Sequence, residues 1–190
     1  MATIAEGYTK AGVDAIVGRA RKEMAEATTP FTVGRRFYSP VSYFWPDYYN
    51  EGQANKKSKW AETLRYATST GYVIMNRNSG DWATFDHDFQ EQAQRALNAG
   101  VKRVLWYVKT QYGVASLPKT DAARQGVPNP DKYTHDQILG QLAYCKKHYG
   151  ELFQGVFLDE MVNGCGAQAP RIAWYKTLVD KIRALYGPGF

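Results

Sequence analysis

Gln154-Gly155-Val156-Phe157-Leu158-Asp159-Glu160-Met161 is the stretch of sequence that decides the fold class. Its centre, Val156-Phe157-Leu158, is a short apolar run of the kind that fills a strand buried on both faces of a parallel sheet. Two carboxylates, Asp159 and Glu160, follow where such a strand would end. Strand ends of this kind hold the chemistry of α/β barrels, although Asp159 could equally cap the next element or pair with a lysine. The stretch therefore indicates a buried parallel strand that leads into a candidate site.

The rest of the chain alternates between strand-like and helix-like segments. Strands are predicted near residues 36–44, 71–76, 102–109 and 154–159. Apolar residues at helical spacing predict helices over 60–68, 85–97, 134–149 and 170–185. Such alternation indicates a parallel sheet with right-handed crossovers and strands in sequential order. A doubly wound sheet and a (β/α) barrel both fit. The first strand is not followed by Gly-x-Gly-x-x-Gly, which argues against dinucleotide binding.

Polar residues follow the predicted strands and are expected to converge on one rim of the sheet, because parallel strands end at the same edge. They are Asn76 and Asn78, Lys109 and Tyr112, and Asp159 and Glu160. Aromatic side chains are also expected at this rim, where they would hold sugar rings: Tyr43, Trp82 and Tyr112. Filling the core is the ordinary alternative for such rings.

Composition excludes several other classes of function. The 190 residues carry a formal net charge of +6, but Lys and Arg are scattered, and without a basic run interleaved with aromatics we expect no nucleic-acid partner. A membrane span or secretory signal is not visible, so no membrane partner is expected. The two cysteines, Cys145 and Cys165, and three scattered histidines give neither a disulfide framework nor a zinc site. We expect no metal and no cofactor.

Residues 8–27 predict a separate N-terminal helix with a narrow apolar stripe. The stripe consists of Val13, Ile16, Val17, Ala20, Met24 and Ala27. Such a stripe suits an oligomer seam or docking onto another protein. It is equally consistent with a helix that packs on the chain's own domain. We expect residues 1–35 to form an attachment or oligomerisation segment that contacts another chain, and residues 36–190 to form the main domain.

The sequence carries two family resemblances. Gly7-Tyr8-Thr9-Lys10-Ala11-Gly12-Val13-Asp14-Ala15-Ile16 resembles a stretch that recurs in bacteriophage tail and tail-fibre proteins. Three further segments resemble, in the same order along the chain, three motifs of the spherulin-4 family. They are Val73-Ile74-Met75-Asn76-Arg77-Asn78-Ser79-Gly80, the segment from Ala99 to Gly113, and Gly155-Val156-Phe157-Leu158-Asp159-Glu160. Pro40, Tyr43, Phe44 and Pro46 resemble that family's first strand, and the likeness covers roughly residues 36–186.

The second resemblance implies a (β/α)₈ barrel, related to the TIM barrel and to glycoside hydrolases that cut galactosamine-containing polysaccharides. It maps the family's active-site aspartate onto Asp159. Arg77 and Asp81-Trp82 depart from the family pattern. The chain holds only four strand-helix units, and the family's remaining site residues, an Asn and a Glu, come from later strands. Because Val156-Phe157-Leu158 is too apolar for an exposed edge, the native chain is expected to continue past Phe190 with a fifth strand; the competing explanation is that another copy of the chain or another tail protein covers this edge.

Glycoside hydrolysis usually takes two carboxylates. As neighbours in a strand, Asp159 and Glu160 are expected to point to opposite faces unless the strand has already broken there, and we expect Asp159 in the site and Glu160 in support. A second catalytic carboxylate would then be missing, unless Asp81 supplies it.

The resulting hypothesis is a minor tail or tail-tip protein of a bacteriophage, in the virion or outside cells, that binds or hydrolyses polysaccharide of the host surface. It would contact other tail proteins, or further copies of itself, through residues 8–27. The alternatives are a non-catalytic glycan-binding or purely structural virion protein, or a stand-alone microbial glycoside hydrolase.

Overall fold

The computed structural model describes residues 37–47, 58–162 and 169–190. The chain divides into two compact units, Met1–Arg36 and Phe37–Phe190, and all described residues belong to the second. The helix predicted over residues 8–27 and its proposed contact with another chain lie outside the described residues, as does Cys165.

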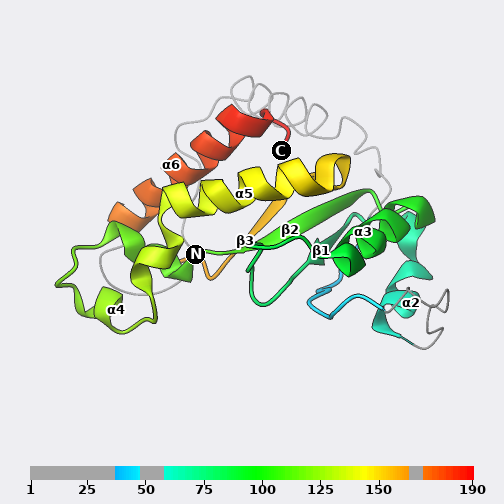
Figure 1. Ribbon diagram of the computed structural model, residues 1–190, viewed down its shortest axis with the longest axis horizontal. Helices are drawn as coiled ribbons and strands as arrows, with labels where there is room; N and C mark the ends of the chain where they lie inside the picture. The colour runs from blue at the N-terminus through cyan, green and yellow to red at the C-terminus, as the bar shows by residue number, and fades with distance from the viewer. Residues whose placement is uncertain (1–36, 48–57, 163–168) are drawn as a thin grey trace, which may run out of the picture. The chain divides into compact units, whose positions relative to one another are not determined.

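A three-stranded parallel sheet forms the centre of the second unit (Figure 1). Strands β1 (Tyr72–Met75), β2 (Arg103–Lys109) and β3 (Val156–Asp159) lie in the order β1-β2-β3. Ile74 is in register with Leu105, and Tyr107 with Phe157. The predicted α/β class, with parallel strands in sequential order, is confirmed for these three strands. Within the described residues the sheet is open rather than closed into a barrel.

The strand predicted over residues 36–44 is wrong beyond its first residues. Tyr38 forms a single parallel bridge with Thr70, and the chain then leaves the sheet. The hydroxyl of Ser42 takes the place of a backbone partner, because it donates to the carbonyl oxygen of Ile74 (3.1 Å) and accepts from the N–H of Ile74 (2.6 Å). Pro40, which has no N–H, cannot extend the ladder. One side chain therefore supplies hydrogen bonds to the backbone N–H and carbonyl of Ile74 at the edge of β1.

The hydrophobic core lies between one face of the sheet and helices α3 (His87–Ala99), α5 (His135–Tyr149) and α6 (Ala169–Tyr186). Alternate strand residues enter this core: Val73, Met75, Val104, Trp106 and Val108. The ring centroids of Trp106 and Tyr149 lie 4.1 Å apart. Figure 1 shows α5 and α6 on the same side of the sheet. None of the helices among the described residues is long and apolar enough to cross a bilayer.

Helix ends follow their local sequence. Thr134 caps α5 by accepting from the N–H of Gln137, and Gly100 ends α3 in the left-handed region (φ 108°); threonine and glycine are residue types that favour these two positions. The short elements are α2 (Lys59–Leu64), η1 (Ala67–Ser69), η2 (Gln111–Ser116), α4 (Ala122–Gln125), η3 (Pro130–Tyr133) and η4 (Gly150–Leu152).

The long connection after β2 is held by one buried arginine. The guanidinium of Arg124, 7% exposed, donates to the carbonyl oxygens of Ala115 (2.8 Å) and Leu117 (2.9 Å) and pairs with Asp131. The two ends of this connection are thus tied to each other by a single side chain.

We predict that Ser42→Ala lowers the free energy of unfolding by about 2 kcal/mol, because the N–H and carbonyl of Ile74 would lose a buried partner. Urea denaturation measures the effect. Ser39→Ala on the exposed part of the same segment is the control and should change stability by less than about 0.5 kcal/mol. Equal effects of the two substitutions would contradict the role given to Ser42.

Candidate functional site

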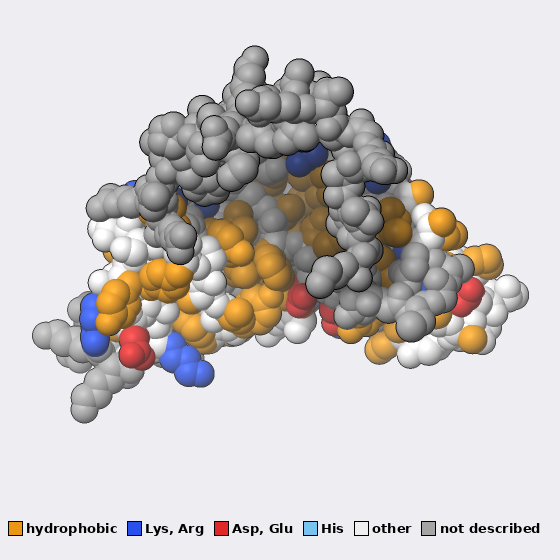
Figure 2. Space-filling view, turned by 180° about the vertical axis from the view of Figure 1, so that it is seen from behind, with side chains coloured by type: hydrophobic (Ala, Val, Ile, Leu, Met, Phe, Trp, Pro, Cys, Tyr) orange, Lys and Arg blue, Asp and Glu red, His pale blue; other side chains and the backbone are white. Residues whose placement is uncertain are grey.

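The candidate site lies on the sheet face opposite the three long helices. Side chains alternate along a strand, so this face carries the residues between the core positions. They include Ile74 on β1, Leu105, Tyr107 and Lys109 on β2, and Phe157 and Asp159 on β3. Figure 2 shows the molecule from behind, where hydrophobic side chains gather beside carboxylates.

Asp159 is oriented by a tyrosine on the neighbouring strand. The hydroxyl of Tyr107 donates to Oδ2 of Asp159 at 2.6 Å. Tyr107 is only 4% exposed, and its ring packs edge-on against Tyr43 with centroids 5.3 Å apart. Tyr43 also contacts Phe157, at 6.0 Å between centroids. An aromatic cluster thus surrounds one half-buried carboxylate at the end of β3.

Burial is the main cause of altered ionisation in this cluster. It raises the pKa of Tyr43 to about 12, with a further contribution from the charge of Asp159. Burial raises the pKa of Tyr107 further still, and the hydrogen bond to Asp159 adds to that effect. Both hydroxyls therefore stay protonated at neutral pH, so Tyr107 remains a donor to the carboxylate.

Glu160 does not point away from this site, because the strand has ended before it; the expectation of opposite faces required an unbroken strand and does not apply. The strand ends at Asp159, and Glu160 adopts a left-handed backbone (φ 53°). This reversal brings Oε1 of Glu160 to 3.2 Å from Nζ of Lys109, which lies on the same face as Tyr107. Nζ of Lys109 is also 5.8 Å from the ring centre of Tyr133.

Each of the three strands is followed by left-handed backbone. Positive φ angles occur at Asn78, Ser79 and Gly80 after β1, at Gln111, Tyr112 and Gly113 after β2, and at Glu160 after β3. A non-glycine residue in this region costs on the order of 1–3 kcal/mol, and such residues cluster at functional sites. The rim predicted from polar sequence is therefore also the place where backbone strain accumulates.

The other predicted rim residues differ in their surroundings. Asn76 follows β1 on the face of Tyr107, and its Oδ1 is buried without a hydrogen-bond partner. Tyr112 is 41% exposed and is tied to the rim through its N–H, which donates to the carbonyl of Glu160 at 2.6 Å. Asn78 lines a separate cavity of about 90 Å³ together with Asp81, Lys132 and Gln141.

Trp82 is not a rim residue, and that prediction is wrong. It is fully buried, its Nε1 donates to the carbonyl of Tyr107 at 2.9 Å, and its ring packs against Phe89 and Trp106. Asp81 accepts a hydrogen bond from the N–H of Ala83 (3.1 Å), and among the described residues no hydrogen bond or ion pair joins its side chain to Asp159.

Sequence reasoning missed three residues that shape the site: Tyr107, Thr110 and Tyr175. Tyr107 was detectable, because a two-residue period from Lys109 places it on the same face. Thr110 donates through Oγ1 to the carbonyl of Asp159 at 2.6 Å and contacts the hydroxyl of Tyr175, also at 2.6 Å. Tyr175 belongs to α6, and no local pattern connects it with the strand ends.

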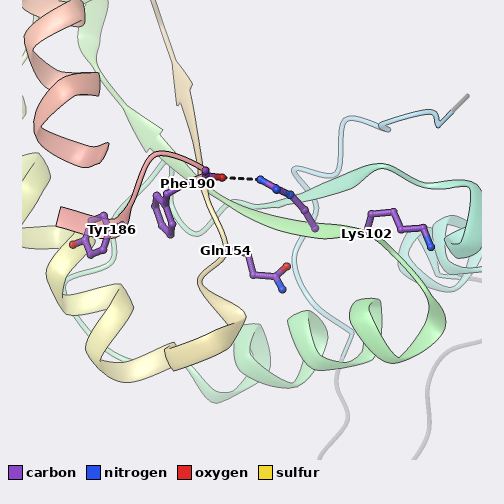
Figure 3. Close-up of a pocket in the computed structure, with 6 residues that line it drawn as sticks. Lys102, Gln154, Tyr186 and Phe190 are labelled. Carbon is purple, nitrogen blue, oxygen red and sulfur yellow. Dashed lines mark hydrogen bonds between the residues drawn. The ribbon is translucent and has the colours of Figure 1, made fainter. Parts of the chain in front are cut away.

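The opposite end of the sheet holds a second pocket of about 300 Å³ (Figure 3). Arg103 and Gln154 line it; Nη1 of Arg103 donates to the carbonyl of Gly189 (3.0 Å), and Oε1 of Gln154 accepts from the N–H of Val104 (2.9 Å). Asp159 lies at the other end of the sheet, where parallel α/β folds usually place their ligands, so that end is kept as the candidate site. No group of three or more potential metal ligands occurs among the described residues.

Comparison with known proteins gives no relative: no family model, no curated protein and no solved structure matches this chain.

We predict that Gly80→Ala destabilises the domain by more than about 1 kcal/mol. Gly80 has φ 89°, and a Cβ there would lie 3.0 Å from the N of Lys109 and 3.3 Å from the carbonyl oxygen of Tyr107. The matched control is Gly140→Ala in α5, where a Cβ meets nothing within 4 Å. That change should stabilise by about 0.5–1 kcal/mol. Urea denaturation of both variants tests the pair; a stable Gly80→Ala variant would remove the constraint at this strand end.

We also predict that the domain loses stability as pH rises from about 10 towards 12. In the unfolded chain Tyr43 ionises near its ordinary pKa of about 10, whereas the folded state holds its pKa at about 12. The unfolded state therefore releases its proton first, which favours unfolding in this window. Urea denaturation across the window should show a shallower decline for Tyr43→Phe, and identical declines would contradict the effect.

Proposed function

We propose that residues 37–190 bind a polysaccharide at the aromatic and carboxylate surface formed by Tyr43, Tyr107, Phe157 and Asp159. The observation that carries the proposal is the half-buried carboxylate of Asp159. The hydroxyl of Tyr107 orients it by donating to Oδ2 at 2.6 Å, and the exposed rings of Tyr43 and Tyr112 lie on the same part of the chain's surface. Sites for small polar ligands combine apolar walls with a few placed polar groups, and this surface has both.

The chemistry of the surface suits sugar rings. The C–H faces of a pyranose pack on aromatic rings, and Tyr43 (37% exposed) and Tyr112 (41% exposed) are accessible for such contact. Sugar hydroxyls are donors, and Asp159 offers acceptor oxygens.

Hydrolysis is the second candidate activity. The left-handed turn at Glu160 puts both carboxylates at the same strand end, which the two-carboxylate mechanism of glycosidases requires. Lys109 compensates the charge of Glu160 at 3.2 Å, so we assign Asp159 to the substrate and Glu160 to a supporting role. Binding is therefore the primary proposal, and cleavage would need a further group from outside the described residues.

The biological setting is proposed from sequence resemblance alone. The likeness of residues 7–16 to phage tail proteins supports a virion tail component that meets host surface polysaccharide, with residues 1–35 attaching it to other tail proteins or to further copies of itself. The spherulin-4 resemblance supports a (β/α) barrel relation and a carbohydrate substrate. A stand-alone glycoside hydrolase and a purely structural virion protein are the alternatives.

We predict that Asp159→Asn and Tyr43→Ala each weaken binding to bacterial cell-wall polysaccharide by about 10-fold, the loss expected for one good contact of about 1.4 kcal/mol. Isothermal titration with solubilised polysaccharide measures the affinity. Asp81→Asn is the matched control, because Asn can still accept from Ala83 and no contact joins this residue to Asp159. Release of reducing ends by the wild-type chain would establish cleavage, and Asp159→Asn should then abolish it. Absence of any polysaccharide binding by the wild-type chain would overturn the proposal.

A further inference from the structure

The pocket at the amino end of the sheet gathers hydrogen-bond donors without a carboxylate beside them. The described residues that line its volume of about 300 Å³ are Lys102, Arg103, Gln154, Tyr186, Gly189 and Phe190. This set contains two cations, one amide and no aspartate or glutamate. None of its members belongs to the candidate site around Asp159, so the pocket has a chemistry of its own.

Arg103 is held in place and still has donors to offer. A guanidinium carries five N–H donors. Nη1 donates to the carbonyl of Gly189 at 3.0 Å, and the described residues provide this side chain with no other hydrogen bond and no ion pair. The planar fork of an arginine matches the oxygens of an anion. Arg103 therefore presents an oriented positive charge that no described carboxylate neutralises.

Gln154 turns its NH₂ group towards a ligand because its oxygen is already used. The N–H of Val104 donates to Oε1 of Gln154 at 2.9 Å. Only the oxygen of an amide can accept, so this contact fixes which way the amide is turned. Nε2 donates to no acceptor in the described part of the chain, which leaves both of its hydrogens for a ligand.

The remaining side chains add charge and an apolar wall. Lys102 lines the pocket, but Figure 3 shows its ammonium directed away from Gln154, so it contributes charge rather than a direct contact. On the opposite side of Gln154 lie the rings of Tyr186 and Phe190, with centroids 4.8 Å apart. An anionic group would thus meet donors, and an organic part attached to it would meet the rings.

We propose that this pocket binds the phosphate group of a small phosphorylated ligand, with Arg103 and Gln154 donating to the phosphate oxygens and Tyr186 and Phe190 packing on the organic part. A phosphate group has three acceptor oxygens and more charge than a carboxylate, so it makes fuller use of these donors. The volume suits a small molecule. The site does not depend on polysaccharide binding, because Asp159 lies at the other end of the sheet.

The test on the full chain compares inorganic phosphate, glucose 1-phosphate and unphosphorylated glucose at constant ionic strength. Amide chemical shifts in NMR spectra follow each titration. We expect both phosphates to give saturable shifts at Val104, Gln154 and Gly189, glucose to give none there, and glucose 1-phosphate to bind several-fold more tightly than inorganic phosphate. Absence of saturable shifts at these positions with either phosphate would overturn the proposal. Equal affinities of the two phosphates would overturn the role of the rings and identify free phosphate as the ligand.

Gln154→Glu tests the donor without removing the contact that Gln154 makes in the fold. A carboxylate oxygen can still accept from Val104, but a second oxygen replaces the NH₂ group and repels phosphate. We expect phosphate binding to weaken about 10-fold or more, without loss of stability on urea denaturation. Gln137→Glu is the matched control, because it makes the same change in charge at an exposed position of α5 outside this pocket, and it should keep the wild-type affinity. Equal losses in the two variants would overturn the proposal, because net charge rather than Gln154 would then govern binding.

Arg103→Lys tests the fork separately from the charge. The substitution keeps one positive charge and removes the planar pair of donors, so phosphate binding should weaken several-fold. Arg65→Lys is the control, since Arg65 is exposed and does not line the pocket. Wild-type affinity in Arg103→Lys would overturn the role given to the guanidinium. If Arg103→Lys does not fold, Gln154→Glu and the wild-type titrations still decide the proposal.

Discussion

Alternation of side chains along β2 is the constraint on which both the core and the candidate site depend. β2 is the central strand, paired on both edges, so neither its register nor its orientation can change without breaking two ladders. Trp106 and Val108 point into the helix-covered core, and Tyr107 and Lys109 therefore point to the other face. A slip of one residue would bury the lysine and expose the tryptophan. Stability of the core thus fixes the two side chains that hold Asp159 and Glu160.

The site also depends on how the strands end. Residues with left-handed backbone follow all three strands. At Glu160 the left-handed backbone turns the side chain to the sheet face of Lys109, where the two side chains form an ion pair; a continued strand would have turned it to the opposite face. The strain is offset from outside the strand, because the Tyr112 N–H donates to the carbonyl of Glu160 at 2.6 Å; the Tyr175 hydroxyl lies 3.1 Å from the same carbonyl. The long helix α6 and the connection after β2 are therefore part of the site, although neither contributes a carboxylate.

Much of the framework was predictable because its signals are local. A two-residue or helical period is contained in a few consecutive residues, which is why three of the predicted parallel strands and the helices α3 and α5 agree with the structure. The same holds for Asp159 at the end of β3. The prediction of the first strand was wrong beyond its first residues. Its aromatic, strand-like sequence does not reveal that the hydroxyl of Ser42, rather than a backbone group of that segment, bonds to the backbone of Ile74. The prediction that Trp82 lies at the rim was wrong because the sequence around an aromatic residue in a polar loop does not indicate whether its ring is buried in the core.

The sequence by itself determined the α/β class, the order of elements and the presence of carboxylates at the end of an apolar strand, since these follow from spacing along the chain. Only the tertiary structure decided what surrounds those carboxylates. Tyr107 meets Asp159 across 52 positions of sequence, and Lys109 meets Glu160 only because the backbone reverses at Glu160, directly after β3. Tyr175 reaches that reversal from a separate helix. Contacts of this kind depend on which side chains the packed sheet and helices bring within hydrogen-bond distance, and that information is absent from any single stretch of the chain.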